Sequence, residues 1–226
     1  QWDYAQEEVR QRFLGLFEET LERYDFDGLE LDFMRFPYYF EQEDIDQHCD
    51  DMTEFIRDVR AILDGTGRHI ALIPRLASNP GAARQLGFDV QAWAREGLVD
   101  GITTGNFLTS CWDLAVEDFR ELVGPDVAIY AGTMAPADQR DALPVRWLPA
   151  SQEMLRGFAA GYLVAGADGI NTFNYFIAHK VRSGTTEEFY AGLLEMHSLE
   201  HARSNPRIHV ISSGCRLTEC DMPVQV

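Results

Sequence analysis

Apolar and acidic residues alternate strictly from Leu29 to Phe33, and this is the sharpest pattern in the chain. In a β-strand with this sequence Leu29, Leu31 and Phe33 share one face, while Glu30 and Asp32 share the other. An exposed antiparallel strand shows the same alternation, so the pattern alone leaves open whether the carboxylates are functional or only solvated. Charged groups are rarely buried unless they are paired or in use, so the context of the strand decides.

Helical spacing of apolar residues marks the segments around this strand. From Glu7 to Tyr24 apolar side chains recur every three or four residues, which predicts a helix with one buried stripe. Similar spacing, with Asp89, Ser151 and Thr185 as capping residues, predicts further helices at 52–63, 90–98, 113–123, 154–163 and beyond 185. Apolar runs of strand length separate these helices, at 69–74, 101–107, 127–131 and 169–176. Strand and helix therefore alternate along the chain.

An Asp-Gly pair followed by Leu or Ile opens an apolar run at Asp27, Asp100 and Asp168, each time after a helical pattern. These pairs lie about 70 residues apart, which is the length of two strand–helix units. The alternation predicts an α/β protein with a parallel sheet of right-handed βαβ units, whose functional groups lie at the carboxyl ends of the strands.

A parallel (β/α) barrel of TIM type is the predicted fold class. A complete barrel needs about 250 residues and eight strands, so about five units are expected in this chain, and the first three would lie upstream of Gln1. Aligning the Asp-Gly pairs places Glu30, Thr103 and Asn171 at one level of the barrel interior. Polar residues there favour a binding site, with an internal hydrogen-bond network as the alternative. An open α/β sheet is the alternative fold.

The predicted barrel domain covers residues 1–205, and 206–226 form a C-terminal tail or the start of a β element, with a short strand at 209–214. The connection from Gly132 to Ala150 is longer than a plain loop needs, and loops of that length tend to be functional.

Composition narrows the possible partners. The formal net charge of −18 over 226 residues disfavours nucleic acid and anionic membranes, which would both repel the chain. No apolar run reaches the roughly 18 residues of a membrane span. Metal-binding cysteine spacings and glycine-rich phosphate loops are absent from the sequence, so we expect no metal and no cofactor. The compartment stays open.

One segment resembles the fourth strand of glycoside-hydrolase-like barrels. It is Asp27-Gly-Leu-Glu-Leu-Asp32, which follows the 7–25 helix and precedes Arg35-Phe-Pro37. The resemblance is to barrels related to family ten of that group and, more distantly, to the α-amylase superfamily. It implies that Asp32 matches the nucleophile. In those relatives an acid/base glutamate ends the fifth strand and a further aspartate ends the seventh. Pro74-Arg75 and Gly132-Thr-Met134 occupy these two positions here, so neither carboxylate is matched.

A second resemblance is to the family-eighteen chitinases, whose strand carries the pattern DGxDxDxE. Met34 occupies the place of their acid glutamate. This departure removes the proton donor that the resemblance would otherwise imply.

Glycoside cleavage ordinarily needs two carboxyl groups. We expect Asp32 to act as nucleophile or transition-state stabiliser. Glu30 would raise its proton affinity and engage Arg35 or Asn171. The proton donor would come from an upstream strand or from the acidic loop, which holds Glu41, Glu43 and Asp44.

Substrate contacts are expected from side chains near the strand ends. Aromatic rings would stack on sugar faces, amides would bind hydroxyl groups, Arg75 would meet an acidic sugar or pair with a carboxylate, and His179 would act as general acid or base. The expected substrate-binding set is Arg35, Tyr38, Tyr39, Arg75, Asn106, Trp147, Asn171, Asn174, Tyr175 and His179.

The sequence thus predicts a glycoside hydrolase acting on an oligo- or polysaccharide at a site around Asp32. One alternative is a carbohydrate-binding barrel that has lost its acid/base and no longer catalyses. Another is an open-sheet α/β enzyme of a different kind. Exposed sheet edges would further allow homo-oligomers.

Overall fold

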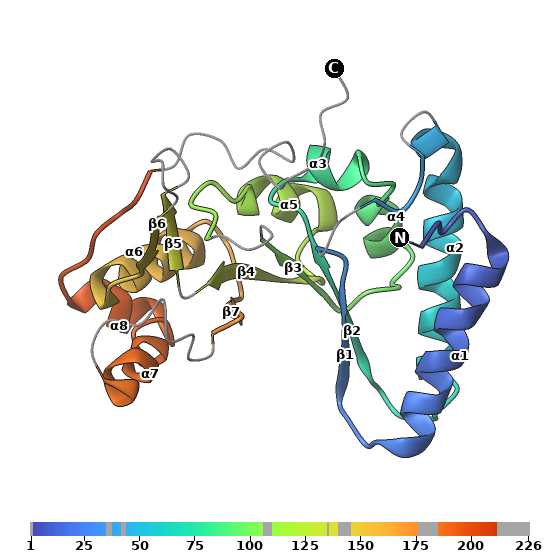
Figure 1. The fold of residues 1–226 in the computed structure, drawn as a ribbon, viewed down its shortest axis with the longest axis horizontal. Helices are drawn as coiled ribbons and strands as arrows, with labels where there is room; N and C mark the ends of the chain where they lie inside the picture. The colour runs from blue at the N-terminus through green and yellow to red at the C-terminus, as the bar shows by residue number, and fades with distance from the viewer. Residues whose placement is uncertain are drawn as a thin grey trace. The chain divides into compact units, whose positions relative to one another are not determined.

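A parallel sheet organises the computed structural model of this protein, which describes residues 2–34, 38–41, 44–105, 110–134, 136–139, 146–175 and 185–211. Its strands lie in the order β1-β2-β3-β4-β7 (Figure 1). Their bounds are Gly28–Asp32, Ala71–Leu76, Gly101–Thr104, Ala128–Met134 and Gly169–Phe173. Parallel strands with helices between them confirm the predicted α/β class and the partial barrel of about five units.

The helices follow the predicted alternation. They are α1 (Glu7–Arg23), α2 (Ile45–Asp64), α3 (Pro80–Arg84), α4 (Val90–Arg95), α5 (Val116–Val123), α6 (Gln152–Val164), α7 (Thr186–Leu194) and α8 (Leu199–Ser204). The three predicted caps are confirmed: Asp89 accepts from the Ala92 amide, Ser151 caps α6, and Thr185 forms a capping box. Each cap satisfies amides that the first turn leaves without partners.

The chain divides into two compact parts. The first comprises Gln1–Ile102 and Asp118–Ala128, and the second comprises Thr103–Glu117 and Ile129–Val226. In the first part α1 and α2 lie side by side (Figure 1), and α2 buries an apolar face that includes Phe55. In the second part α6 packs against α8. Both cores are built from the apolar helix faces that the sequence pattern indicated.

The Asp-Gly repeat has a structural role at the start of two strands. The Asp100 amide donates to the Leu72 carbonyl (3.0 Å), and its carboxylate accepts from the Leu72 amide (2.8 Å). Asp168 makes the same reciprocal pair with Ile129, at 2.8 Å in both directions. In each case the aspartate carboxylate continues the hydrogen-bond ladder toward the strand that precedes it in the sheet.

Several elements differ from the sequence expectation. Strand β2 runs on to Leu76, so Arg75 lies inside the strand and not after it. The expected long loop after Gly132 contains an antiparallel pair, β5 (Pro136–Gln139) and β6 (Arg146–Pro149). Short strands flanked by prolines lack the apolar alternation that would have indicated them. Helix α3 begins at Pro80, between the predicted 69–74 strand and the predicted 90–98 helix.

The segment after α8 is bound to α6. The Arg156 guanidinium donates to the Pro206 carbonyl (2.6 Å), and the Ile208 amide donates to the Glu153 carbonyl (2.9 Å). Gly157 permits this crossing, because a Cβ there would collide with the Ile208 carbonyl. Residues 206–211 form no strand, and the rest of the expected 209–214 strand lies outside the described residues.

We predict that Asp100→Ala lowers the free energy of unfolding by about 2 kcal/mol, because the Leu72 amide loses its acceptor and the buried Arg60 loses one ion-pair partner. Asp27→Ala, at the equivalent but exposed aspartate, should leave the unfolding midpoint unchanged. Urea denaturation followed by circular dichroism measures both. Equal effects of the two substitutions would contradict the structural role of Asp100.

Candidate active site

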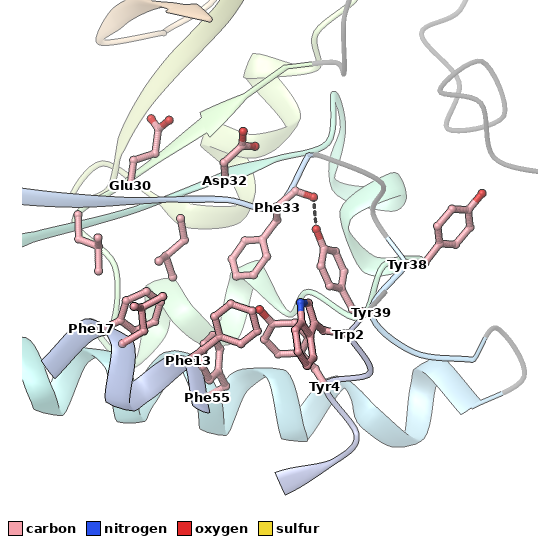
Figure 2. Close-up of a pocket in the computed structure, with 13 residues that line it drawn as sticks. Trp2, Tyr4, Phe13, Phe17, Glu30, Asp32, Phe33, Tyr38, Tyr39 and Phe55 are labelled. Carbon is pink, nitrogen blue, oxygen red and sulfur yellow. Dashed lines mark hydrogen bonds between the residues drawn. The ribbon is translucent and has the colours of Figure 1, made fainter. Parts of the chain in front are cut away.

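Strand β1 separates two chemically different surfaces. Figure 2 shows Glu30 and Asp32 pointing away from the helices, while Phe33 points toward the aromatic side chains of α1 and α2. The period of two that the sequence predicted therefore exists in the structure. The helix-facing side is buried at Leu31 and Phe33. The other side holds both carboxylates, so this is the face on which chemistry can occur.

The Asp32 carboxylate is held by two donors. The Arg75 guanidinium donates to Oδ1 over 2.7 Å, and the Met34 amide donates to the same oxygen over 2.9 Å. Asp32 and Arg75 face each other in the parallel register of β1 and β2. The side chain of Asp32 remains 35% exposed, while that of Arg75 is only 2% exposed. The carboxylate is thus fixed in orientation and still open to a ligand.

The buried guanidinium explains why the pair matters. Removing a cation from water is costly unless a close carboxylate and further acceptors compensate for the lost hydration. An arginine that donates to a carboxylate also stabilises its negative charge. Of the two roles that the sequence left open for Arg75, pairing with a carboxylate is the one present here.

A pocket of about 610 Å³ lies along β1, mostly on its helix-facing side, and Glu30 and Asp32 also border it. Aromatic side chains from the N-terminal segment, from α1 and α2 and from residues 38–39 line most of it (Figure 2). The full lining is Trp2, Tyr4, Phe13, Leu16, Phe17, Leu29, Glu30, Leu31, Asp32, Phe33, Tyr38, Tyr39 and Phe55.

Tyr38 and Tyr39 line this pocket. The Tyr39 hydroxyl donates to the Phe33 carbonyl, and its ring contacts Tyr4, Phe33 and Phe88. Burial raises the pKa of Tyr39 far above its usual value, and the nearby Tyr4 and Asp32 add to this effect. In Figure 2 Tyr39 lies on the other side of the strand from the Glu30 and Asp32 carboxylates, while Tyr38 points away from this cluster.

Three predicted contacts belong to the second part of the chain. Asn171 lies half-buried in β7, and Asn174 follows that strand with a φ of 50°, a left-handed conformation that asparagine tolerates. The ring of Tyr175 stacks on Phe189, and its hydroxyl donates to the Phe189 carbonyl (3.3 Å). Burial raises the pKa of Tyr175 to about 12, so this hydroxyl stays protonated at neutral pH.

Arg35, Asn106 and His179 lie outside the described residues, as does Glu43 of the acidic loop. Trp147 lies in β6, opposite Asp138 in β5. Of the remaining acidic loop, Glu41 is exposed and Asp44 is half-buried.

A network of buried hydroxyl groups with hydrogen-bond partners lies in the second part. Thr133 is buried, and its hydroxyl lies 3.2 Å from that of Ser110, which also donates to the Met134 carbonyl (3.0 Å) and accepts from the Met134 amide (3.1 Å). Buried hydroxyls need such partners.

Within the described ranges no group of three or more histidine, cysteine, aspartate or glutamate side chains is arranged to hold a metal ion. No helix among those residues has the length and hydropathy to cross a membrane.

Comparisons with known proteins add information on the fold. No family model matches the chain, and no curated relative matches its sequence. Among solved structures, a chitinase from Rhizomucor miehei is similar with a TM-score of 0.57 and 11% identity, over 86% of this chain and 76% of that one. A chitinase from Chromobacterium violaceum has a TM-score of 0.54 and 12% identity, over 88% and 73%. A chitinase-like agglutinin from Robinia pseudoacacia has a TM-score of 0.54 and 11% identity, over 85% and 74%.

The fold is therefore a (β/α) barrel like that of these solved structures, present here in part. This confirms the barrel that the Asp27–Asp32 motif implied. The similar solved structures named here include chitinases, the group that the strand pattern resembled apart from Met34.

We predict an energetic coupling between Asp32 and Arg75. In the native protein Asp32→Asn should lower the free energy of unfolding by about 2 kcal/mol, because Arg75 is left buried without its anionic partner. In the Arg75→Met variant the same substitution should lower it by about 1 kcal/mol or less. Chemical denaturation of the four proteins gives the coupling. The exposed pair Asp25 and Arg68 serves as the control and should show a coupling near zero. Equal coupling in both pairs would contradict the buried-pair interpretation.

Proposed function

We propose that the protein is a glycoside hydrolase that acts on an oligo- or polysaccharide, with Asp32 as nucleophile or transition-state stabiliser. The observation that carries the proposal is the state of this carboxylate: it lies at the carboxyl end of β1, is bound by Arg75 and the Met34 amide, and remains one-third exposed. Functional groups of parallel α/β barrels lie at this end of the strands.

The chemistry of such a carboxylate suits glycoside cleavage. Positive charge develops on the sugar ring as the glycosidic bond breaks, and a fixed anion beside the ring stabilises it or attacks it. Fixing the carboxylate before the reaction avoids the cost of orienting it in the transition state. Asp32 acts as an anion in this proposal, so a different residue would protonate the leaving group.

Glu30 has a secondary role in this proposal. It lies two positions earlier on the same face of β1 and is exposed. From there it would influence Asp32 through its charge and contact the substrate, without being placed across the scissile bond. The remaining predicted contacts, including Asn171 and Asn174, stay candidate substrate residues.

A second function has its own support. Met34 stands at the position of the acid glutamate in the chitinase pattern and is only 1% exposed, so this position offers neither a proton donor nor access for one. The chain would then be a carbohydrate-binding barrel that does not catalyse. A chitinase-like agglutinin shows the same fold, which is compatible with this alternative.

The test is release of reducing sugar from chitin oligosaccharides and from neutral and acidic polysaccharides. We predict that Asp32→Asn lowers activity about 10³-fold or more, since loss of a nucleophile or charge stabiliser removes several kcal/mol of transition-state stabilisation. Glu30→Gln should lower it by about tenfold or less. Asp46→Asn, at an exposed carboxylate on α2, serves as the control and should retain full activity.

Binding by the same proteins, measured by isothermal titration calorimetry, separates the two functions. If the native protein binds a glycan without hydrolysing it and Asp32→Asn abolishes this binding, the binding barrel is favoured and Asp32 has no catalytic role. Hydrolysis that survives Asp32→Asn unchanged would contradict the role of this residue in either function.

A further inference from the structure

We propose that Arg75 is a positioning residue for Asp32: it binds one carboxylate oxygen, Oδ1, and thereby leaves the other, Oδ2, as the oxygen that faces the substrate. This inference rests on the proposed function of Asp32. It adds a second residue to that function and assigns different tasks to the two carboxylate oxygens. Arg75 acts through Asp32 and does not touch the substrate itself.

Both donors to the Asp32 carboxylate bind the same oxygen. The Arg75 guanidinium and the Met34 amide donate to Oδ1, over 2.7 and 2.9 Å. Among the residues that the structure describes, none donates a hydrogen bond to Oδ2. An ionised carboxylate has about four acceptor positions, about two on each oxygen. Two donors on Oδ1 therefore leave Oδ2 to bind a ligand.

The two donors constrain the carboxylate in different ways. Met34 follows Asp32 by two residues, so its amide bond to Oδ1 is local and moves with the end of β1. Arg75 belongs to the neighbouring strand, where its carbonyl accepts from the Phe33 amide (3.3 Å). The terminal torsion of an aspartate side chain is otherwise broad. The guanidinium therefore ties the plane of the carboxylate to the sheet.

Burial limits what else Arg75 can do. Its side chain is only 2% exposed, so it does not reach a sugar on the open side of the carboxylate. Stability alone does not explain the guanidinium either, because apolar side chains of similar volume often replace a buried ion pair without loss. Asp32 is 35% exposed and would stay hydrated without Arg75. Holding Asp32 in one orientation is the role that fits both observations.

Orientation matters for the proposed chemistry. Positive charge that develops on the sugar ring is best stabilised by an anion already in place, since turning a mobile carboxylate toward it costs free energy. A residue that only positions this anion changes kcat more than KM, because other groups bind the substrate. Lysine in place of Arg75 would keep the positive charge and lose the planar set of donors that fixes Oδ1.

Steady-state kinetics of Arg75→Lys test this assignment, with the chitin oligosaccharide or polysaccharide that the native protein cleaves fastest. We expect kcat to fall about tenfold or more while KM stays within about twofold of its native value. Arg68→Lys is the matched control, because Arg68 pairs with Asp25 at the surface and its substitution should leave both constants unchanged. Circular dichroism at the assay temperature verifies that both variants are folded.

Arg75→Ala supplies a second measurement. Removal of the side chain leaves a space beside Asp32 that a free guanidinium ion can fill. Guanidinium chloride, far below the concentrations that unfold proteins, should raise the kcat of this variant several-fold. Sodium chloride at the same concentration should not. A role of Arg75 in stability alone predicts no such recovery, since guanidinium weakens folded proteins.

The outcomes separate this inference from the proposed function. Hydrolysis with an unchanged kcat in Arg75→Lys would overturn the role of Arg75 and leave that of Asp32 intact. A raised KM at unchanged kcat would also overturn it and assign Arg75 to substrate binding. A folded Arg75→Ala variant whose kcat does not respond to guanidinium would contradict positioning. If the native protein hydrolyses nothing, the proposed function fails and this inference fails with it.

Discussion

The ion pair between Asp32 and Arg75 is the constraint on which the candidate site depends. A guanidinium that is almost fully buried needs a fixed anion, and the register of β1 and β2 places that anion at the end of the neighbouring strand. The period of the same strand turns Phe33 toward the helices, and Leu31 is buried. Packing on one side of β1 therefore fixes the carboxylate on the other, so helix packing and site geometry are aspects of a single arrangement.

Local features of the fold could be predicted because they depend on neighbours in sequence. The caps at Asp89, Ser151 and Thr185 each involve an amide three residues away, and the alternation in β1 follows from the strand period. The alternation of strands and helices gave the barrel class for the same reason. The pair β5 and β6 was missed, since its strands are short and bordered by prolines.

Contacts between strands could be predicted only in part. The carboxylate of Asp32 was identified from its position, but its pairing with Arg75 depends on a register across 43 residues that no local pattern specifies. The aromatic residues 38 and 39 were expected to bind sugar because they follow the strand. Both line the pocket along β1, and the Tyr39 hydroxyl donates to the Phe33 carbonyl, so their role in sugar binding stays a prediction. The Asp-Gly repeat was visible in the sequence, but its carboxylate-to-amide role required the sheet order.

The crossing of α6 by residues 206–208 has a consequence for the order in which the protein folds. Helix α6 is synthesised some 50 residues before the carbonyl of Pro206 that its Arg156 binds. On the ribosome, that face of the helix can reach its final packing only after this late segment has emerged. The first part contains no residue beyond Ala128. The two parts would therefore mature at different times, and the glycine at 157 keeps a path open on α6 for the segment that arrives last.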